Sequence, residues 1–150
     1  MKFQIFLTWL FLSCSIPNKG LYRDHDRCEL ILKDDTGVER VISLANLPLP
    51  TEIKHHQGLW CDNTHIQASL FFNVYDEKWA LVFMGDKELN IKVNPYGEEG
   101  HIRAKSWSQD LAGDKGCKII QKPGVVFSSD ELISKNNHPF YITFHCKNND

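Results

Sequence analysis

The sequence predicts a mainly β domain, an antiparallel sandwich or barrel-like sheet of about eight strands with one short helix; an α+β arrangement is the alternative. Three observations favour it. Apolar residues recur mostly with a period of two, turn residues separate the apolar runs, and cysteines are spread along the whole chain. With 150 residues, 42% of them hydrophobic and 24% charged, the composition is that of one globular domain.

Residues 1–20 have the pattern of a secretory signal peptide. Lys2 precedes the apolar run Phe3–Leu12, and small and polar residues follow. The run is far shorter than the roughly 20 residues of a membrane-spanning helix. We therefore expect a secreted protein with no membrane span and a single disulfide-stabilised β-rich domain over residues 21–150. The formal net charge of −2 argues against DNA binding, which requires a basic surface.

Beyond the predicted signal peptide the chain has four cysteines, an even number, which predicts two disulfides in an oxidising compartment: Cys28, Cys61, Cys117 and Cys146. All three connectivities are open. The nearest approach to a metal site is His55-His56 with Cys61 and His65, but adjacent side chains of an extended chain face opposite ways. We expect Cys61 to belong to a disulfide, and we expect no metal and no cofactor.

The expected elements follow the chain in order. A hairpin is predicted around Asp34-Asp35-Thr36-Gly37, because aspartate favours turns and glycine accepts positive φ. Pro48 and Pro50 end this unit. The one helix is predicted at Ser128–Glu131, a capping-box pattern followed by Leu132 and Ile133. The strands, beginning with the two of the hairpin, are predicted at Cys28–Lys33, Val38–Leu44, Ile66–Tyr75, Trp79–Met84, Leu89–Val93, His101–Trp107, Cys117–Gln121, Gly124–Phe127 and Phe140–Cys146.

The strand from Ile66 alternates most clearly. Ile66, Ala68, Leu70, Phe72 and Val74 share one face, which we expect to be buried. Phe71 and Tyr75 lie on the opposite face and are the expected exposed aromatic residues, a surface suited to a protein partner. Trp79 is added as a candidate binding residue, although a place in the core is the favoured role for the tryptophans.

No catalytic motif with diagnostic spacing occurs in the sequence. We therefore expect no catalytic residues. The alternative is a hydrolase in which Glu77 is the general base and a histidine, His138 or His145, is the general acid.

Three segments carry a family resemblance: Lys122-Pro-Gly-Val-Val-Phe127, Phe144-His-Cys146 and Tyr75-Asp-Glu77 close to Trp79. Together they resemble the closing part, and the segment with the catalytic glutamate, of small secreted fungal guanyl-type ribonucleases. The family's arginine before the Val-Val-Phe strand is missing here, since Gly124 stands directly before Val125. The resemblance thus implies a degenerate scaffold, similar to the ribonuclease-like secreted effectors of plant-pathogenic fungi.

These observations predict a secreted, non-enzymatic effector or immune-modulating factor that binds a host or partner protein. A secreted ribonuclease-like hydrolase, with RNA as its substrate, is the first alternative. A small-ligand or lipid carrier with an apolar cavity is the second.

Overall fold

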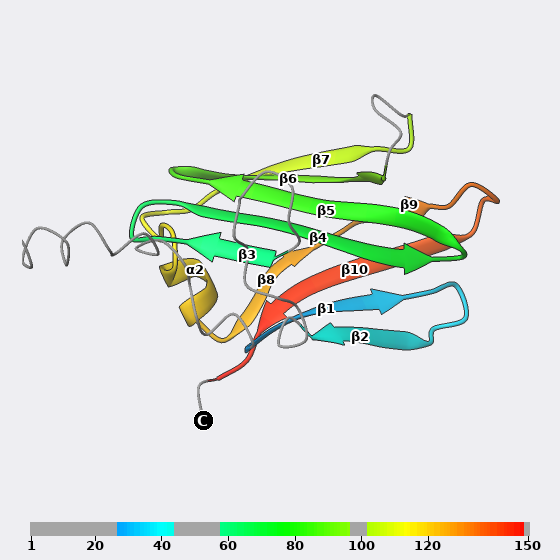
Figure 1. The fold of residues 1–150 in the computed structure, drawn as a ribbon, viewed down its shortest axis with the longest axis horizontal. Helices are drawn as coiled ribbons and strands as arrows, with labels where there is room; N and C mark the ends of the chain where they lie inside the picture. Colours follow the sequence, from blue (N-terminus) through cyan, green and yellow to red (C-terminus); the bar gives the residue numbers. More distant parts are fainter. Residues whose placement is uncertain (1–26, 44–57, 97–101, 149–150) are drawn as a thin grey trace, which may run out of the picture.

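The computed structural model describes residues 27–43, 58–96 and 102–148. The predicted signal peptide, the prolines at 48 and 50, and His55, His56 and His101 lie outside these ranges. Within them the protein is mainly β, with two antiparallel sheets arranged as a sandwich and two disulfides (Figure 1). The predicted fold class is confirmed, and the sandwich is the correct one of its two forms.

The first sheet has the strand order β2-β1-β10-β8, and β9 also pairs with β10. Its hairpin β1–β2 is the predicted one, and Gly37 in its turn has φ 84°. The strands of this sheet are β1 (Cys28–Lys33), β2 (Glu39–Ser43), β8 (Gly124–Ser128), β9 (Leu132–Ile133) and β10 (Pro139–Cys146).

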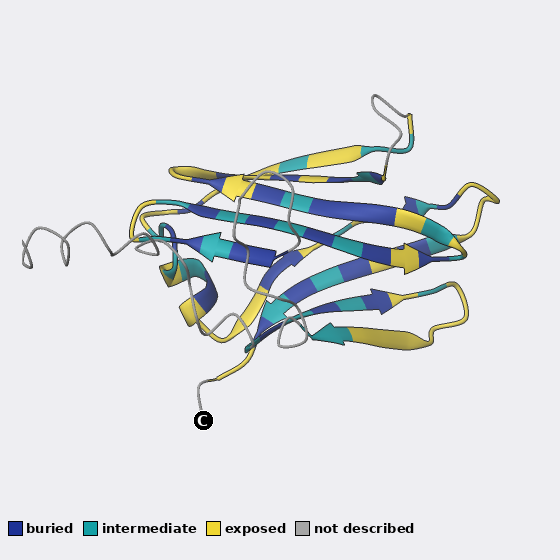
Figure 2. Ribbon diagram, in the orientation of Figure 1, coloured by how far each residue is buried: buried dark blue, intermediate teal, exposed yellow. Residues whose placement is uncertain are grey.

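The second sheet follows the chain, with the order β3-β4-β5-β6-β7. The alternation predicted for β4 is confirmed, because the five residues of its apolar face are all buried (Figure 2). The strands of this sheet are β3 (Gly58–Cys61), β4 (Ile66–Val74), β5 (Glu77–Gly85), β6 (Glu88–Pro95) and β7 (Lys105–Asp110).

Aromatic side chains fill the space between the sheets. Phe83 of β5 meets Phe144 of β10 edge-on, with ring centroids 5.2 Å apart, and Trp79 meets Phe140 at 5.1 Å. All four side chains are fully buried. The inner faces of the two sheets therefore share one core, as the period-two pattern requires.

Side chains of β7 close one side of the sandwich against β8 and β9. The rings of Trp107 and Phe127 pack at 5.1 Å, Gln109 donates to the carbonyl of Val126, and Lys105 donates to the carbonyl of Glu131. These contacts join the edge of one sheet to the edge of the other.

The predicted helix at Ser128–Glu131 is wrong. The segment stays extended because Ser129 bonds Ile142 of β10 twice: its amide donates to the Ile142 carbonyl, and its hydroxyl accepts from the Ile142 amide. Leu132, in β9, then pairs with Phe140 of β10. Cross-strand hydrogen bonds thus override a local capping signal.

The strand predicted at Cys117–Gln121 is also wrong, since α2 (Lys118–Gln121) is the one helix of the described residues. Gly116, with φ 57°, turns the chain into this helix, and the Cys117 amide donates to the carbonyl of Asp62. The helical turn buries Ile120 completely.

The strand expected at His101–Trp107 lies further along the chain, where β7 begins at Lys105. Ile102, expected on an inner face, is 95% exposed in a turn. The apolar residues alone therefore predict the start of this strand too early; in the structure, Trp107 of β7 pairs with Ile91 of β6.

Candidate functional site

Three turns gather at one end of the sandwich, the right-hand end in Figure 1, opposite α2. They connect β1 to β2, β4 to β5, and β9 to β10. We call their residues Asp34–Val38, Tyr75–Asp76 and Ser134–His138 the three-turn surface. Turns held on a rigid sheet scaffold are a common place for binding residues.

The β4–β5 turn has a demanding backbone. Val74 and Glu77 are paired, so Tyr75 and Asp76 alone form the loop, with φ of 49° and 62°. Two-residue hairpins with both φ positive match the twist of the strands, but they favour Asn-Gly or Asp-Gly. The sequence Tyr75-Asp76 matches neither of these dipeptides, so this turn carries backbone strain of about 1 kcal/mol or more per residue.

The Tyr75 side chain ties the three turns together. Its hydroxyl accepts a hydrogen bond from the Asp35 amide at 2.9 Å and donates one to the Pro139 carbonyl at 2.9 Å. Its ring packs against His138 and Phe140, with centroids 5.2 and 6.3 Å away. Burial and the nearby Asp35 raise the pKa of Tyr75, so its hydroxyl keeps its proton and remains a donor.

His138 and Asp35 form an exposed pair across two of these turns. The Nδ1 of His138 lies 2.9 Å from the Asp35 carboxylate, and 51% of the histidine side chain is exposed. The His138 amide donates to the Ser134 hydroxyl, which shapes its own turn. The predicted site residue His138 therefore belongs to the three-turn surface.

Glu77 lies just after the β4–β5 turn, but its carboxylate is fully engaged within the fold. It accepts bonds from Arg103 at 2.8 Å, from the Trp79 indole at 2.8 Å and from the Lys135 amide. Burial alone would raise the pKa of Glu77, but these hydrogen bonds and the charge of Arg103 lower it below its ordinary value. A carboxylate held in this way is a weak base and fastens β5 to its neighbours.

His145 lies at the opposite end of β10 from His138. Its Nε2 is 3.1 Å from the carboxylate of Glu29, which also pairs with Lys147. A hydrogen bond from Lys147 is the main reason that the pKa of Glu29 is lowered. The structure therefore brings Glu77 and His138 to one end of the sandwich and leaves His145 at the other.

The three predicted binding residues, Phe71, Tyr75 and Trp79, do not lie on one exposed surface. Trp79 is fully buried on the inner face of β5. Phe71 lies half-buried on the outer face of β4, where it packs edge-on against the exposed ring of Tyr96 at 4.9 Å. Tyr75 does not share this outer face with Phe71, because the positive φ of the turn points its side chain in another direction.

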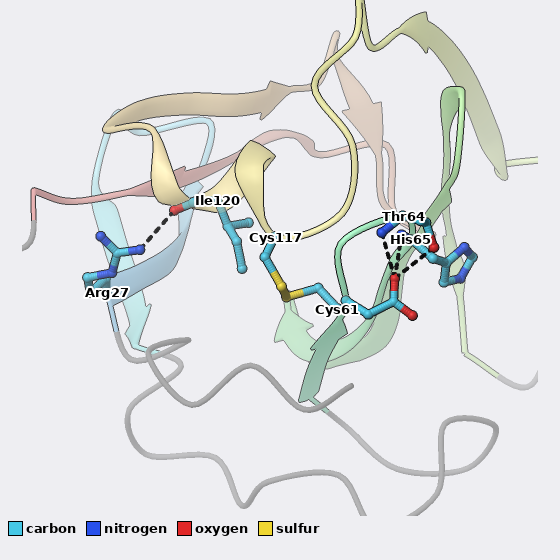
Figure 3. Close-up of a disulfide and its surroundings, with 7 residues drawn as sticks. Arg27, Cys61, Thr64, His65, Cys117 and Ile120 are labelled. Atoms are coloured by element: carbon cyan, nitrogen blue, oxygen red, sulfur yellow. Dashed lines mark hydrogen bonds between the residues drawn. A yellow bond between two sulfur atoms is a disulfide. The ribbon is translucent and has the colours of Figure 1, made fainter. Parts of the chain in front are cut away.

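Two disulfides join the four predicted cysteines, Cys28 to Cys146 and Cys61 to Cys117. The second links β3 to the segment before α2 (Figure 3). His65 follows an Asx turn in which Asp62 Oδ1 accepts from the amides of residues 64 and 65, and its ring packs against Trp60 at 5.6 Å. Cys61 is thus part of a structural link.

In the three described ranges, no group of three or more His, Cys, Asp or Glu side chains is arranged to hold a metal ion. His55 and His56, the other members of the weighed cluster, lie outside these ranges.

Sequence reasoning missed Val38 and Arg40 as site residues, because both looked like ordinary strand positions. Val38 is 62% exposed, and the Arg40 guanidinium donates to the carbonyl of Asn73 at the end of β4. An apolar residue directly after a glycine turn was the signal available for Val38.

Comparison of the chain with protein-family models, curated proteins and solved structures finds no significant match. None of the helices in the described part of the chain is both long and apolar enough to cross a membrane.

Proposed function

We propose that this chain is a secreted, non-enzymatic protein that binds a protein partner through the three-turn surface. The observation that supports this proposal most is the strained turn of Tyr75 and Asp76, in which the tyrosine hydroxyl is hydrogen-bonded to Asp35 and Pro139. Strain of this kind persists only where surrounding contacts enforce it, and it concentrates at functional sites. A surface held rigid before binding loses less conformational entropy when a partner docks.

The side chains displayed there suit a protein surface. Val38 is an exposed apolar residue of this surface and His138 is an exposed polar one, while the exposed Arg40 of β2 lines the same groove as Val38. An apolar centre with a polar rim is typical of protein interfaces. Secretion, through the predicted signal peptide, is part of the same proposal, and so is the role of an effector or immune-modulating factor on the degenerate ribonuclease scaffold.

The test uses a photo-crosslinking residue at one of two valines. Val38 is in the three-turn surface, and Val125, 65% exposed on β8 beside His145, is its matched control at the other end of the sandwich. We expect the probe at position 38 to crosslink a defined protein from the extracellular fluid that surrounds the source cells. Excess wild-type protein should abolish this product, and position 125 should not form it. Equal crosslinking at both positions would contradict the proposal.

An RNA cleavage assay addresses the alternative function. Wild-type protein and Glu77→Gln should both show no turnover above background, because the Glu77 carboxylate is held by Arg103 and Trp79. Cleavage by the wild type that Glu77→Gln or His138→Ala abolishes would favour the ribonuclease-like hydrolase.

A further inference from the structure

A groove opens at the three-turn surface, between the β1–β2 hairpin and the end of β4, and it includes Asp34, Val38 and Tyr75 of that surface. Its volume is about 180 Å³, and its lining residues are Leu32, Asp34, Val38, Arg40, Val74 and Tyr75. Leu32 and Val74 are buried. The volume is below the ~300 Å³ of the smallest drug-sized pockets, so the groove suits a single side chain.

Four of the six residues that line the groove carry aliphatic or aromatic side chains. Val38 contributes an exposed isopropyl group from the hairpin, and Tyr75 contributes a side chain that its two hydroxyl bonds hold in place. An aliphatic side chain inserted here would cover the Val38 surface that is now exposed to water. Burial of apolar area of this kind is favourable by roughly 25 cal/mol per Å².

Two opposite charges give the groove a direction. Asp34 lies at the turn, where its Oδ1 accepts from the amides of Thr36 and Val38. Arg40, in β2, comes two residues after Val38, a separation of about 7 Å in an extended segment. Its guanidinium has five N–H donors, and the bond to the Asn73 carbonyl uses one of them.

We propose that this groove binds a peptide segment in which an aliphatic residue is followed by an acidic residue. The inference rests on the proposed partner-binding function and names the chemistry that the partner presents. The aliphatic side chain lies between Val38 and Tyr75, over Leu32 and Val74. The carboxylate pairs with Arg40, at the end of the groove away from Asp34, because the Asp34 charge repels it at the turn.

The test is an NMR titration of the full chain with two capped tetrapeptides, acetyl-Gly-Leu-Glu-Gly-amide and the same peptide with Gln in place of Glu. We expect saturable methyl shifts at Leu32, Val38 and Val74 with the Glu peptide. The Gln peptide should bind about fivefold more weakly, the effect of an exposed ion pair at the upper end of its usual range. Arg40→Gln should weaken the Glu peptide to the same level, and Arg40→Lys should weaken it less.

Val38→Ser serves as a second variant, because a residue 62% exposed can be changed without disturbing the core. It should reduce binding of both peptides, and Val125→Ser should leave both unchanged. Equal affinity for the Glu and Gln peptides, or shifts centred on Val125, would overturn the proposal.

Failure of the peptide inference is distinguishable from failure of the proposed function. If neither peptide binds while the probe at position 38 still crosslinks its protein, the ligand class is wrong and the three-turn surface remains the interface. If the Glu peptide binds as expected but crosslinking at position 38 is absent, the groove is confirmed and the proposed interface is wrong.

Discussion

At the scale of single residues, Asp76 combines an exposed side chain with a backbone conformation that favours glycine. Its φ is 62°, in the turn that also contains Tyr75. Asp76→Gly should raise the free energy of unfolding by about 0.5–1 kcal/mol, because glycine adopts this conformation without a Cβ penalty. Chemical denaturation measures the change.

A control for this variant is Gly37→Ala, in the neighbouring turn, where φ is 84° and an added Cβ meets nothing within 4 Å. It should destabilise by a similar amount through backbone strain alone. If Asp76→Gly were destabilising, the strain attributed to the β4–β5 turn would be wrong.

Glu77 gives stability a defined pH dependence. Its pKa in the folded chain lies below the ordinary value of 4.5, so the unfolded chain binds more protons in acid. The stabilisation is present above pH 4.5 and is lost as the pH falls through the folded pKa. Glu77→Gln should cost about 2 kcal/mol at pH 7 and should reduce the slope of stability against pH in the acidic range.

Denaturation curves recorded from pH 7 down to pH 3 measure this dependence. Glu88→Gln is the matched control, because Glu88 is an exposed carboxylate at the start of β6. A slope unchanged in Glu77→Gln would show that the contacts to Arg103 and Trp79 do not stabilise the carboxylate.

At the scale of elements, the position of α2 depends on a close backbone approach. A Cβ added to Gly116 would lie 1.8 Å from the Asp62 carbonyl oxygen, and φ is already 57°. Gly116→Ala should therefore lower the free energy of unfolding by about 3 kcal/mol or more, well above the ~1 kcal/mol of Gly37→Ala. Thermal unfolding of the two variants side by side makes the comparison, and equal losses would contradict it.

The elements also indicate where sequence reasoning succeeds. Strands with five alternating residues, such as β4, were predicted correctly because each side chain on the buried face repeats the same signal. The segments at Cys117–Gln121 and Ser128–Ile133 were assigned wrongly. Each is short, and its conformation is set by one distant partner, Asp62 for the first and Ile142 for the second.

At the scale of the whole molecule, the two sheets are held together by rings that meet across the core. Phe83→Ala should lower the free energy of unfolding by about 3–5 kcal/mol, because Phe83 is fully buried against Phe144. The double variant with Phe144→Ala should cost less than the sum of the two single changes, since the residues are in contact. Denaturant titration measures all three.

Phe71→Ala is the matched control for this core pair. Phe71 lies on the outer face of β4, against the exposed Tyr96, so its loss should cost about 1 kcal/mol. A cost as large as that of Phe83→Ala would mean that the outer face of this sheet is packed as tightly as the interior.

The sequence by itself determined the fold class and the set of paired cysteines, because period-two patterning and an even cysteine count are local or compositional signals. Tertiary structure decided which cysteines pair, that Trp79 is buried, and that Tyr75 joins Asp35 and His138. The physical reason is distance along the chain. Residues 35, 75 and 138 come into contact only when both sheets have formed, so no local sequence pattern predicts this contact.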